Sequence, residues 1–277
     1  MKRSVLSPAD VLVGFDAVSL LYPHIPPMSI WRSWEYAAYK RYELTEPVLD
    51  LGCGDGQFFR LVWPKIFDVI GVDMDFTIIN IAKNSGVYRE VLVAQANRLP
   101  FLPRSFASAF ANCSLEHMDH LPEVLNSVFR SLRPGGVFLL SVVTQNLLKW
   151  ISLPHLAEII CGPQRAKALQ SEYENFHHLV NPYPPKIWIE HLTRSGFEVL
   201  EQIPIVPEIS TRFFLFLDHL WHVRQPKGEV GDALQNYFKS ITDFPHAFRD
   251  VLTGILKMER NFNTCSGAVF LTRRQGL

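Results

Sequence analysis

Short apolar segments alternate with segments of helical periodicity along the chain, and this alternation limits the fold more than any other feature. Segments that are apolar throughout are typical of strands in a parallel sheet buried on both faces. The pattern therefore predicts an α/β chain in which helices cover both sides of a parallel sheet. The five predicted strands, rich in Val, Ile, Leu, Ala and Phe, are 47–52, 67–73, 89–96, 106–114 and 136–143.

The best marked helix lies directly before the fifth strand. Its apolar residues over 121–132 recur at intervals of three and four. The Pro-Gly-Gly sequence at 134–136 is expected to end this helix and to turn the chain. Farther along, 186–195 predicts a helix closed by a glycine, 197–206 a sixth strand, and 266–274 a last strand. No regular structure is predicted for most of the stretch between the fifth strand and the helix at 186–195.

Charge and cysteine content exclude several classes of protein. The 27 Lys and Arg balance the 27 Asp and Glu, so the excess of positive charge typical of nucleic-acid binding is missing. Cys53, Cys113, Cys161 and Cys265 form no C-x-x-C pair, which predicts neither a metal site nor a disulfide framework. No signal peptide and no transmembrane segment are predicted. We expect a reduced, cytoplasmic protein with no nucleic-acid partner.

The residues that carry chemistry begin at the first strand. Asp50 lies on this strand, and Gly52, Gly54 and Gly56 alternate directly after it, before a predicted helix. Glycines at such a turn let a ligand lie against bare backbone, although an ordinary strand-to-helix turn is the alternative. A dinucleotide fingerprint would need a third glycine where this chain has Gln57, which counts against a dehydrogenase.

This D-x-G-x-G-x-G pattern resembles motif I of the class I S-adenosylmethionine-dependent methyltransferases. Further segments resemble motifs of that family in the order the family requires: GVDMD at 71–75, AQANRLPF at 94–101, NCSLEHM at 112–118 and LRPGG at 132–136. The resemblance covers residues 48–143. It implies a Rossmann-like, doubly wound sheet of seven strands, the last one antiparallel, with helical lid elaborations. It also implies S-adenosyl-L-methionine as the cofactor and S-adenosyl-L-homocysteine as the product.

The resemblance also assigns roles to the matched positions. Asp50 would help to hold the ammonium group of the methionine moiety. Asp73 would accept hydrogen bonds from both ribose hydroxyls, with a helix N-cap as its alternative role, and Met74 would pack on adenine. Gln95 stands where the family commonly has an aspartate, and its amide oxygen can also accept from the adenine amino group. The expected cofactor residues are Asp50, Gly52, Cys53, Gly54, Asp73, Met74, Gln95, Ala96, Asn97 and Asn112.

The transfer step requires little acid–base catalysis from the protein. Displacement at a sulfonium methyl group is in-line, so the protein mainly has to hold a nucleophile near the methyl carbon. His117 is the candidate general base, because its loop borders the cofactor and a neutral imidazole can take a hydroxyl proton. A structural histidine that fixes the loop is an equally weighted interpretation.

The acceptor pocket must come from the parts outside the matched motifs. Tyr22 and Trp31, in an aromatic amino-terminal stretch, and His177 and Tyr183 are the candidates, with ordinary aromatic packing as the alternative. The segment NPYPP at 181–185 is similar to the N-P-P-Y box of amino-methylating nucleic-acid enzymes. Its order is wrong and it does not follow the fourth strand, so we interpret it as a rigid loop.

The chain is expected to divide around the matched core. Residues 1–46 would form an amino-terminal cap, 47–143 the cofactor-binding core, 144–185 an acceptor-side insertion, and 186–277 the rest of the sheet with a helical insertion at 207–264. The apolar stretch 213–221 admits two interpretations. It is either a buried lid or dimer contact, or an exposed face for a membrane or a lipid-linked acceptor.

Together these features predict methyl transfer from S-adenosylmethionine to a small-molecule, lipid-type or sugar-type acceptor, at oxygen. The alternative is a regulatory or scaffold protein that binds the cofactor without transferring its methyl group. Methylation of RNA is disfavoured by the neutral charge and by the missing N-P-P-Y box.

Overall fold

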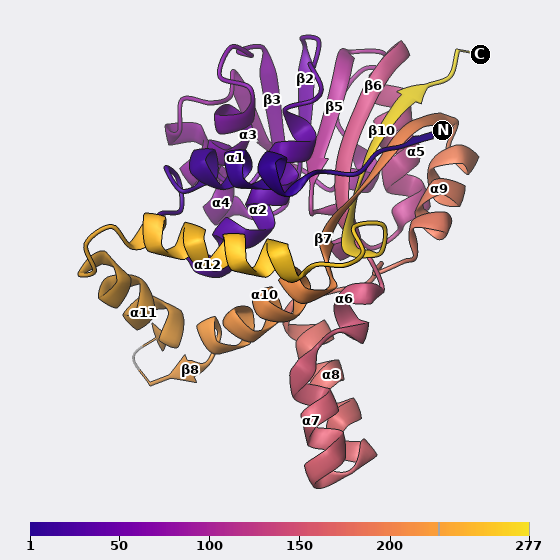
Figure 1. Cartoon of the computed structure of the whole chain (residues 1–277). Helices are drawn as coiled ribbons and strands as arrows, with labels where there is room; N and C mark the ends of the chain where they lie inside the picture. The colour runs from indigo at the N-terminus through magenta and orange to yellow at the C-terminus, as the bar shows by residue number, and fades with distance from the viewer. Residues whose placement is uncertain (227, 277) are drawn as a thin grey trace.

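One eight-stranded sheet with helices on both faces organises the chain (Figure 1). The computed structural model describes residues 1–226 and 228–276. Every neighbouring pair of strands is parallel except where β10 pairs with β6 and β7. The Rossmann-like sheet and its antiparallel last strand are therefore confirmed. In spatial order the strands are β1 (Lys2–Arg3), β7 (Phe197–Pro207), β10 (Cys265–Arg274), β6 (Leu132–Val143), β5 (Phe106–Asn112), β2 (Val48–Leu51), β3 (Val69–Asp73) and β4 (Glu90–Val93).

The predicted count of seven strands is wrong by one edge strand. Strand β1 has two residues, Lys2 and Arg3, which pair with Glu201 and Gln202 of β7. Lys2 Nζ also lies 3.4 Å from Glu201 Oε1. Two charged residues carry no apolar alternation, so no pattern in the sequence marks this strand. A separate ribbon of two short strands, β8 (Arg224–Gln225) and β9 (Gly228–Glu229), lies outside the main sheet.

Side chains alternate along each strand, so the sheet separates two apolar cores. Val48 and Phe110 contribute to the first core, and Leu49 and Leu51 to the second. The short helix α4 (Phe76–Asn84) follows β3. The first core is shared with α1 (Pro8–Val18), α2 (Pro26–Tyr39), α3 (Gln57–Val62), α10 (Glu208–Trp221) and α12 (Phe244–Met258), and the second with α5 (Leu121–Ser131) and α9 (Pro185–Arg194).

The predicted turn at 134–136 lies inside a strand. Helix α5 ends at Ser131, and β6 already begins at Leu132, which pairs with Phe106 of β5. The pairing shifts register between Phe106 and Ser108, and Gly135 absorbs the irregularity with a φ of 78°. The helical periodicity runs on to Leu132 because this side chain is fully buried in the strand as well.

Residues 144–185 are largely helical, although no regular structure was predicted for most of them. They form α6 (Asn146–Lys149), α7 (Ser152–Cys161) and α8 (Pro163–Phe176). Figure 1 shows α7 and α8 projecting away from the sheet. The second insertion forms α10, α11 (Val230–Lys239) and α12.

The apolar stretch 213–221 belongs to α10 and is packed over most of its surface. Leu215 is buried, and Phe213 stacks on Phe248 of α12 at 6.4 Å between ring centroids. Phe216, by contrast, is 63% exposed, and Leu220 is 40% exposed. The lid interpretation therefore fits this helix. An exposed lipid-binding face would consist of only two side chains of this stretch, Phe216 and Leu220.

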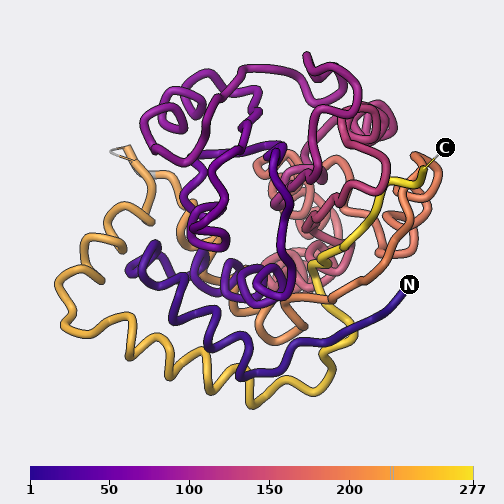
Figure 2. The backbone as a smooth tube through the Cα atoms, turned by 90° about the horizontal axis from the view of Figure 1, so that it is seen from above, coloured from indigo at the N-terminus to yellow at the C-terminus, as the bar shows by residue number. Residues whose placement is uncertain are grey.

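The amino-terminal helices and α12 lie side by side, although the sequence separates them widely. Figure 2 shows α12 running along the amino-terminal helices, and Arg249 of α12 forms an ion pair with Asp16 of α1. Within residues 1–226 and 228–276, no helix combines the length and the apolar character that crossing a membrane requires.

Candidate active site

The turn between β2 and α3 forms the floor of the site. Gly52 has a φ of 69°, and a Cβ at this position would lie 2.6 Å from Ser114 Cβ. Glycine is therefore required here for both its conformation and its lack of a side chain. The backbone N–H of Gly54 donates to Asp73 Oδ2 (3.2 Å), which ties the turn to the end of β3.

A cavity of about 750 Å³ lies over this turn, at the carboxyl ends of the central parallel strands. Ligands bind at this edge in open α/β sheets, because the order of the strands reverses there. Eight of the ten predicted cofactor residues line the cavity: Gly52, Gly54, Asp73, Met74, Gln95, Ala96, Asn97 and Asn112.

The other two predicted cofactor residues, Asp50 and Cys53, line an adjoining cavity of about 100 Å³. The Tyr88 hydroxyl lies 2.7 Å from Asp50 Oδ2. Burial raises the pKa of Asp50 to about 7, although the hydrogen bond from Tyr88 opposes this shift. Tyr22, predicted for the acceptor pocket, lines this small cavity instead.

Polar atoms without partners around these cavities fit a nucleoside that carries an amino acid. Arg32 lines both cavities, and its Nε is buried without a hydrogen-bond partner among the described residues. Asn97 Oδ1 is unpaired in the same way. A guanidinium suits a carboxylate, an amide oxygen suits an amino donor, and the buried carboxyl of Asp50 would be stabilised as its anion by an ammonium group. These residues therefore fit S-adenosylmethionine.

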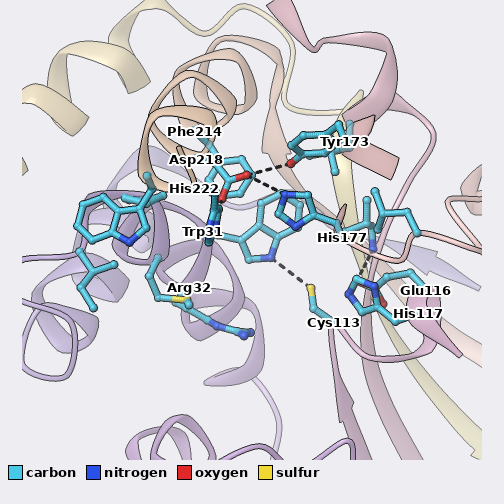
Figure 3. Close-up of a pocket in the computed structure, with 17 residues that line it drawn as sticks. Trp31, Arg32, Cys113, Glu116, His117, Tyr173, His177, Phe214, Asp218 and His222 are labelled. Carbon is cyan, nitrogen blue, oxygen red and sulfur yellow. Dashed lines mark hydrogen bonds and ion pairs between the residues drawn. The ribbon is translucent and has the colours of Figure 1, made fainter. Parts of the chain in front are cut away.

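A second large pocket, of about 360 Å³, adjoins the cofactor cavity (Figure 3). The two share Arg32, Cys113 and His117 as lining residues. Trp31, predicted for the acceptor pocket, lines this one and packs on Phe214 of α10 at 5.2 Å between ring centroids. Further apolar side chains come from widely separated elements: Val143, Leu147, Leu179 and Trp221.

A cluster around Asp218 lies in another part of the wall of this pocket. Asp218 Oδ2 accepts from the Tyr173 hydroxyl (3.1 Å) and lies 3.2 Å from His177 Nε2. Its Oδ1 lies 3.5 Å from His222 Nε2. Burial raises the pKa of Asp218, but the hydrogen bonds and charges of the two histidines outweigh burial and hold it well below its usual range. In turn, the hydrogen bond to Asp218 raises the pKa of His222 to about 8.

His177, predicted to lie near the acceptor, lines this pocket, and Tyr183 does not. Tyr183 stacks on His191 of α9 at 5.4 Å between ring centroids and joins the second apolar core. The loop that carries Tyr183 is hydrogen-bonded to the segment 115–118 through Val180 and Asn181.

Asn181 of that loop fastens the segment 115–118 in place. Its Nδ2 donates to the carbonyl oxygens of Leu115 (3.0 Å) and Met118 (2.6 Å). The backbone N–H groups of Val180 and Asn181 both donate to the carbonyl oxygen of Glu116. We call these four hydrogen bonds the Asn181 clasp. The clasp connects the acceptor-side insertion to the loop that borders the cofactor cavity.

His117 lies where the two large cavities meet. Its Nδ1 lies 3.2 Å from the carbonyl oxygen of His178, so Nδ1 carries the proton and Nε2 is left as an acceptor. Burial lowers the pKa of His117, which favours the neutral ring.

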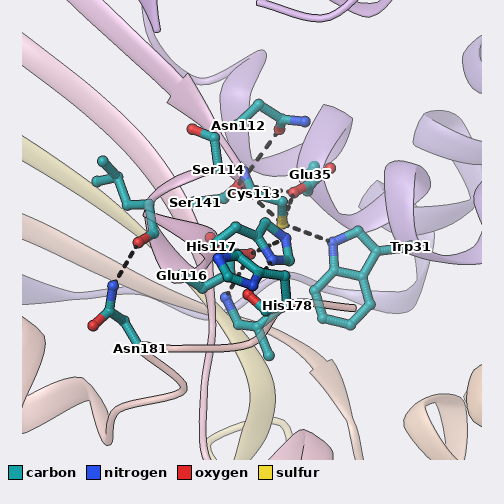
Figure 4. A network of polar contacts seen from close by, with 12 residues as sticks. Trp31, Glu35, Asn112, Cys113, Ser114, Glu116, His117, Ser141, His178 and Asn181 are labelled. Carbon is teal, nitrogen blue, oxygen red and sulfur yellow. Dashed lines mark hydrogen bonds and ion pairs between the residues drawn. The ribbon is translucent and has the colours of Figure 1, made fainter. Parts of the chain in front are cut away.

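Sequence reasoning missed a buried polar network beside His117 (Figure 4). Glu35 of α2 is fully buried and pairs with Arg32. Its Oε1 also accepts from Cys113 Sγ (2.9 Å) and from Ser141 Oγ (2.7 Å). A signal was present, because Arg32 and Glu35 are charged residues three positions apart in a helix whose other residues, apart from two serines, are aromatic or apolar. Glu116 was missed as well, although it lies within the recognised motif.

The cysteines and acidic groups of the described chain make no metal centre. Over residues 1–226 and 228–276, no three His, Cys, Asp or Glu side chains are grouped so that they could hold a metal ion. Cys53, Cys113, Cys161 and Cys265 all carry free thiols.

Comparisons with known proteins identify relatives of this chain. Residues 33–202, more than half of the chain, match a family model described as a methyltransferase domain. Malonyl-[acyl-carrier protein] O-methyltransferase from Hamiltonella defensa is 33% identical over 102 residues, which are 37% of this chain and 40% of that protein. The chain thus spans less than half of that relative. The 2-phytyl-1,4-naphtoquinone methyltransferase of Thermosynechococcus vestitus is 24% identical over 207 residues, 69% of this chain and 92% of that protein.

Solved structures share the fold. Geranyl diphosphate C-methyltransferase from Streptomyces coelicolor, solved with Mg²⁺, geranyl diphosphate and S-adenosyl-L-homocysteine, superposes with a TM-score of 0.54. The match covers 89% of this chain and 79% of that one, at 13% sequence identity.

Proposed function

The chain belongs to the class I S-adenosylmethionine-dependent methyltransferase family, and from this premise we propose that it methylates a hydroxyl oxygen of a small-molecule acceptor. One observation carries the proposal. The cavity that fits the cofactor and the apolar pocket beside it share Arg32, Cys113 and His117 as lining residues. A molecule in the pocket would therefore lie next to the bound cofactor, as displacement at a methyl group requires.

Each group around the cofactor cavity has a proposed task. Arg32 would hold the carboxylate of the methionine moiety, Asp50 its ammonium group, and Asp73 the ribose hydroxyls. When bound, S-adenosylmethionine supplies an electrophilic methyl group on a sulfonium centre. His117 presents an unprotonated Nε2 at the junction, which makes it a candidate base for an acceptor hydroxyl.

The character of the pocket supports a small apolar acceptor. Its walls are mainly aromatic and aliphatic, and they include Trp31, Phe214 and Trp221. Two relatives are named for methylation of a naphthoquinone and of malonyl-[acyl-carrier protein], so lipid-type and carrier-bound acceptors both occur among similar proteins. We also propose a cytoplasmic location, which the four free thiols support.

Two measurements test this proposal in sequence. Calorimetry with S-adenosylhomocysteine tests cofactor binding, and one site per chain is expected. Incubation with methyl-labelled S-adenosylmethionine and fractionated host extract then tests transfer, and label is expected in a low-molecular-weight aqueous or organic fraction. Label confined to acid-precipitable material would overturn the small-molecule acceptor. Cofactor binding without transfer to any fraction would favour the alternative, a cofactor-binding protein without transfer activity.

A further inference from the structure

Two buried glutamates lie beside the junction of the cavities, and only one of them has its hydrogen-bonding capacity filled. Both carboxylate oxygens of Glu35 are engaged, by Cys113 and Ser141 on one side and by Arg32 on the other. Glu116 Oε1 accepts from the backbone N–H of Val143 (3.2 Å). Glu116 Oε2, however, is buried and has no hydrogen-bond partner in the part of the chain that the structure describes.

An oxygen in this state is costly unless something else binds it. A buried polar group without a partner has lost its hydration and gained no hydrogen bond in return, which destabilises the folded chain. His117 does not fill the gap, because its Nε2 lies 4.0 Å from the other oxygen, Oε1. The Asn181 clasp holds the backbone of Glu116, and the hydrogen bond from the Val143 N–H holds its Oε1, so both the main chain and the carboxyl of Glu116 are fixed in place.

The unpaired carboxyl belongs to the wall of the acceptor pocket. Glu116 lines that pocket together with Trp31 and Phe214, and its side chain is 0% exposed to solvent. Bulk water therefore does not compete for this oxygen. A ligand that fills the pocket would meet aromatic side chains such as Trp31 and Phe214 and would lie near the carboxyl of Glu116, whose Oε2 has no partner among the described residues (Figure 3).

We propose that Glu116 Oε2 binds the hydroxyl group of the acceptor and takes up its proton during transfer. The acceptor is then an uncharged, apolar compound that carries a hydroxyl group and is about as large as an aromatic ring system. The inference rests on the proposed function and deepens it. The acceptor oxygen forms the new bond to the methyl carbon, and the carbon–sulfur bond breaks with its electron pair left on sulfur. The hydroxyl proton moves to Glu116 Oε2.

The same geometry discriminates among acceptors. A free carboxylic acid is ionised at neutral pH, so it has no proton to donate to Glu116 and would lie against a second carboxylate. Among the described residues of the pocket wall, Arg32 pairs with Glu35 through Nη1, and its free Nε is assigned to the cofactor carboxylate. His222 pairs with Asp218. The pocket is thus built for a hydroxyl donor rather than for a carboxylate.

The acid–base character of Glu116 agrees with this role. Burial raises the pKa of Glu116 to about 7, and the charge of Glu35 adds to the rise. A base with this pKa is most effective near neutral pH. The ionisable groups that surround Glu116 are Glu35 and Arg32 on α2, Cys113 after β5, and its neighbour His117, with His177, Asp218 and His222 in other parts of the pocket wall.

Naphthalene derivatives test the inference directly, because they are apolar and differ in one group. The probes are 1-naphthol, 1-methoxynaphthalene and 1-naphthoate, added to the protein saturated with S-adenosylhomocysteine. Binding is followed by tryptophan fluorescence, since Trp31 and Trp221 line the pocket. At pH 8 we expect 1-naphthol to bind at least tenfold more tightly than the other two, with an affinity that rises between pH 6 and 8.

Variants at position 116 distinguish the effect of the Glu116 carboxyl from the effect of the surrounding pocket. Glu116→Gln keeps the shape but removes the titration, and Glu116→Leu removes the hydrogen-bond acceptor. We expect the first to abolish the pH dependence of 1-naphthol binding and the second to reduce the preference for 1-naphthol at least fivefold. Glu43→Gln, at an exposed carboxylate before β2, serves as the matched control and should change neither property.

The outcomes that would overturn the inference are distinct. If 1-naphthol binds no more tightly than 1-methoxynaphthalene, or if neither binds, the assignment of Glu116 is wrong. The assignment is also wrong if Glu116→Gln keeps the pH dependence. If His117→Gln alone loses that dependence, His117 rather than Glu116 accepts the proton. S-adenosylhomocysteine binding is measured for every variant. Failure of the wild-type protein to bind it would overturn the proposed function and this inference with it.

Discussion

The cofactor cavity and the acceptor pocket lie side by side, but they are built in different ways. The cofactor cavity takes its polar groups mainly from segments that directly follow parallel strands, such as Gly52 after β2 and Asp73 at the end of β3. The acceptor pocket takes its side chains from helices far apart in the sequence, such as Trp31 in α2 and Phe214 in α10. Sheet register determines the first site, and helix packing determines the second.

This difference should be visible in the size of the effect of a single substitution and in which ligand's affinity it changes. A change in the cofactor cavity removes contacts that the backbone turns hold in place, so its effect should be large and confined to cofactor affinity. A change in the acceptor pocket alters a packed surface, so its effect should be moderate and confined to the second ligand.

The largest effect is expected for Asp73→Ala. Hydrogen bonds to a charged carboxylate contribute about 1.5–3 kcal/mol each, so losing two should weaken S-adenosylhomocysteine binding about 100-fold or more. Calorimetry measures this affinity. Asp75→Ala is the matched control, because Asp75 caps α4 by accepting from the backbone N–H groups of Thr77 and Ile78. It should cost about 1 kcal/mol of stability and change the affinity little. An Asp73→Ala protein that binds within tenfold of the wild type would contradict the ribose role.

An intermediate effect is expected for Phe214→Ala. Its ring lines the pocket beside Trp31, and an aromatic contact with a bound ligand contributes about 0.5–1.5 kcal/mol beyond its buried area, so 1-naphthol affinity should fall about tenfold. S-adenosylhomocysteine affinity should stay within twofold. Phe216→Ala, on the same helix but 63% exposed, should leave both affinities unchanged. Equal losses of both ligands in Phe214→Ala would show that the two sites are not independent.

The smallest effect is expected from pH, through the cluster around Asp218. The pKa of His222 is raised from 6.5 to about 8 in the folded chain. Its contribution to stability is therefore fully present below pH 6.5 and is lost as pH rises through 8. Since the side chain is about a third exposed, we expect a loss of about 1 kcal/mol between pH 6.5 and 9. Urea unfolding of the wild type and His222→Gln measures it, and the variant should lack this part of the pH dependence. Identical pH profiles would exclude His222 as its source.

The same contrast explains what the sequence could predict. The apolar pattern predicts the parallel sheet, and the family resemblance implies the antiparallel last strand and the residues that the structure brings to the cofactor cavities. Tyr22 and Tyr183 were expected at the acceptor pocket and lie elsewhere. Asp218 and His222 were not considered at all. Asp218 and His222 lie four positions apart on α10, but their partners Tyr173 and His177 lie in a different part of the sequence, and such contacts leave no local pattern that could place the cluster.

Glu116 and His117 show that prediction from sequence is limited even within the recognised motif. The resemblance identifies the segment that contains both, and it led to His117 because imidazole is the familiar base. That Glu116 is fully buried, with one oxygen unpaired among the described residues, follows from the packing of β6 and the insertion around it.

The Asn181 clasp has a consequence for protein engineering. Insertions such as 144–185 are attractive units to exchange between enzymes when a new substrate is wanted. In this chain an exchange of the whole insertion would remove the hydrogen bonds by which Val180 and Asn181 hold the loop with Glu116 and His117. A transplanted insertion should therefore either include the donor's loop through Asn181 or leave the recipient's loop in place. The loop with Glu116 and His117 then keeps its position beside the grafted helices.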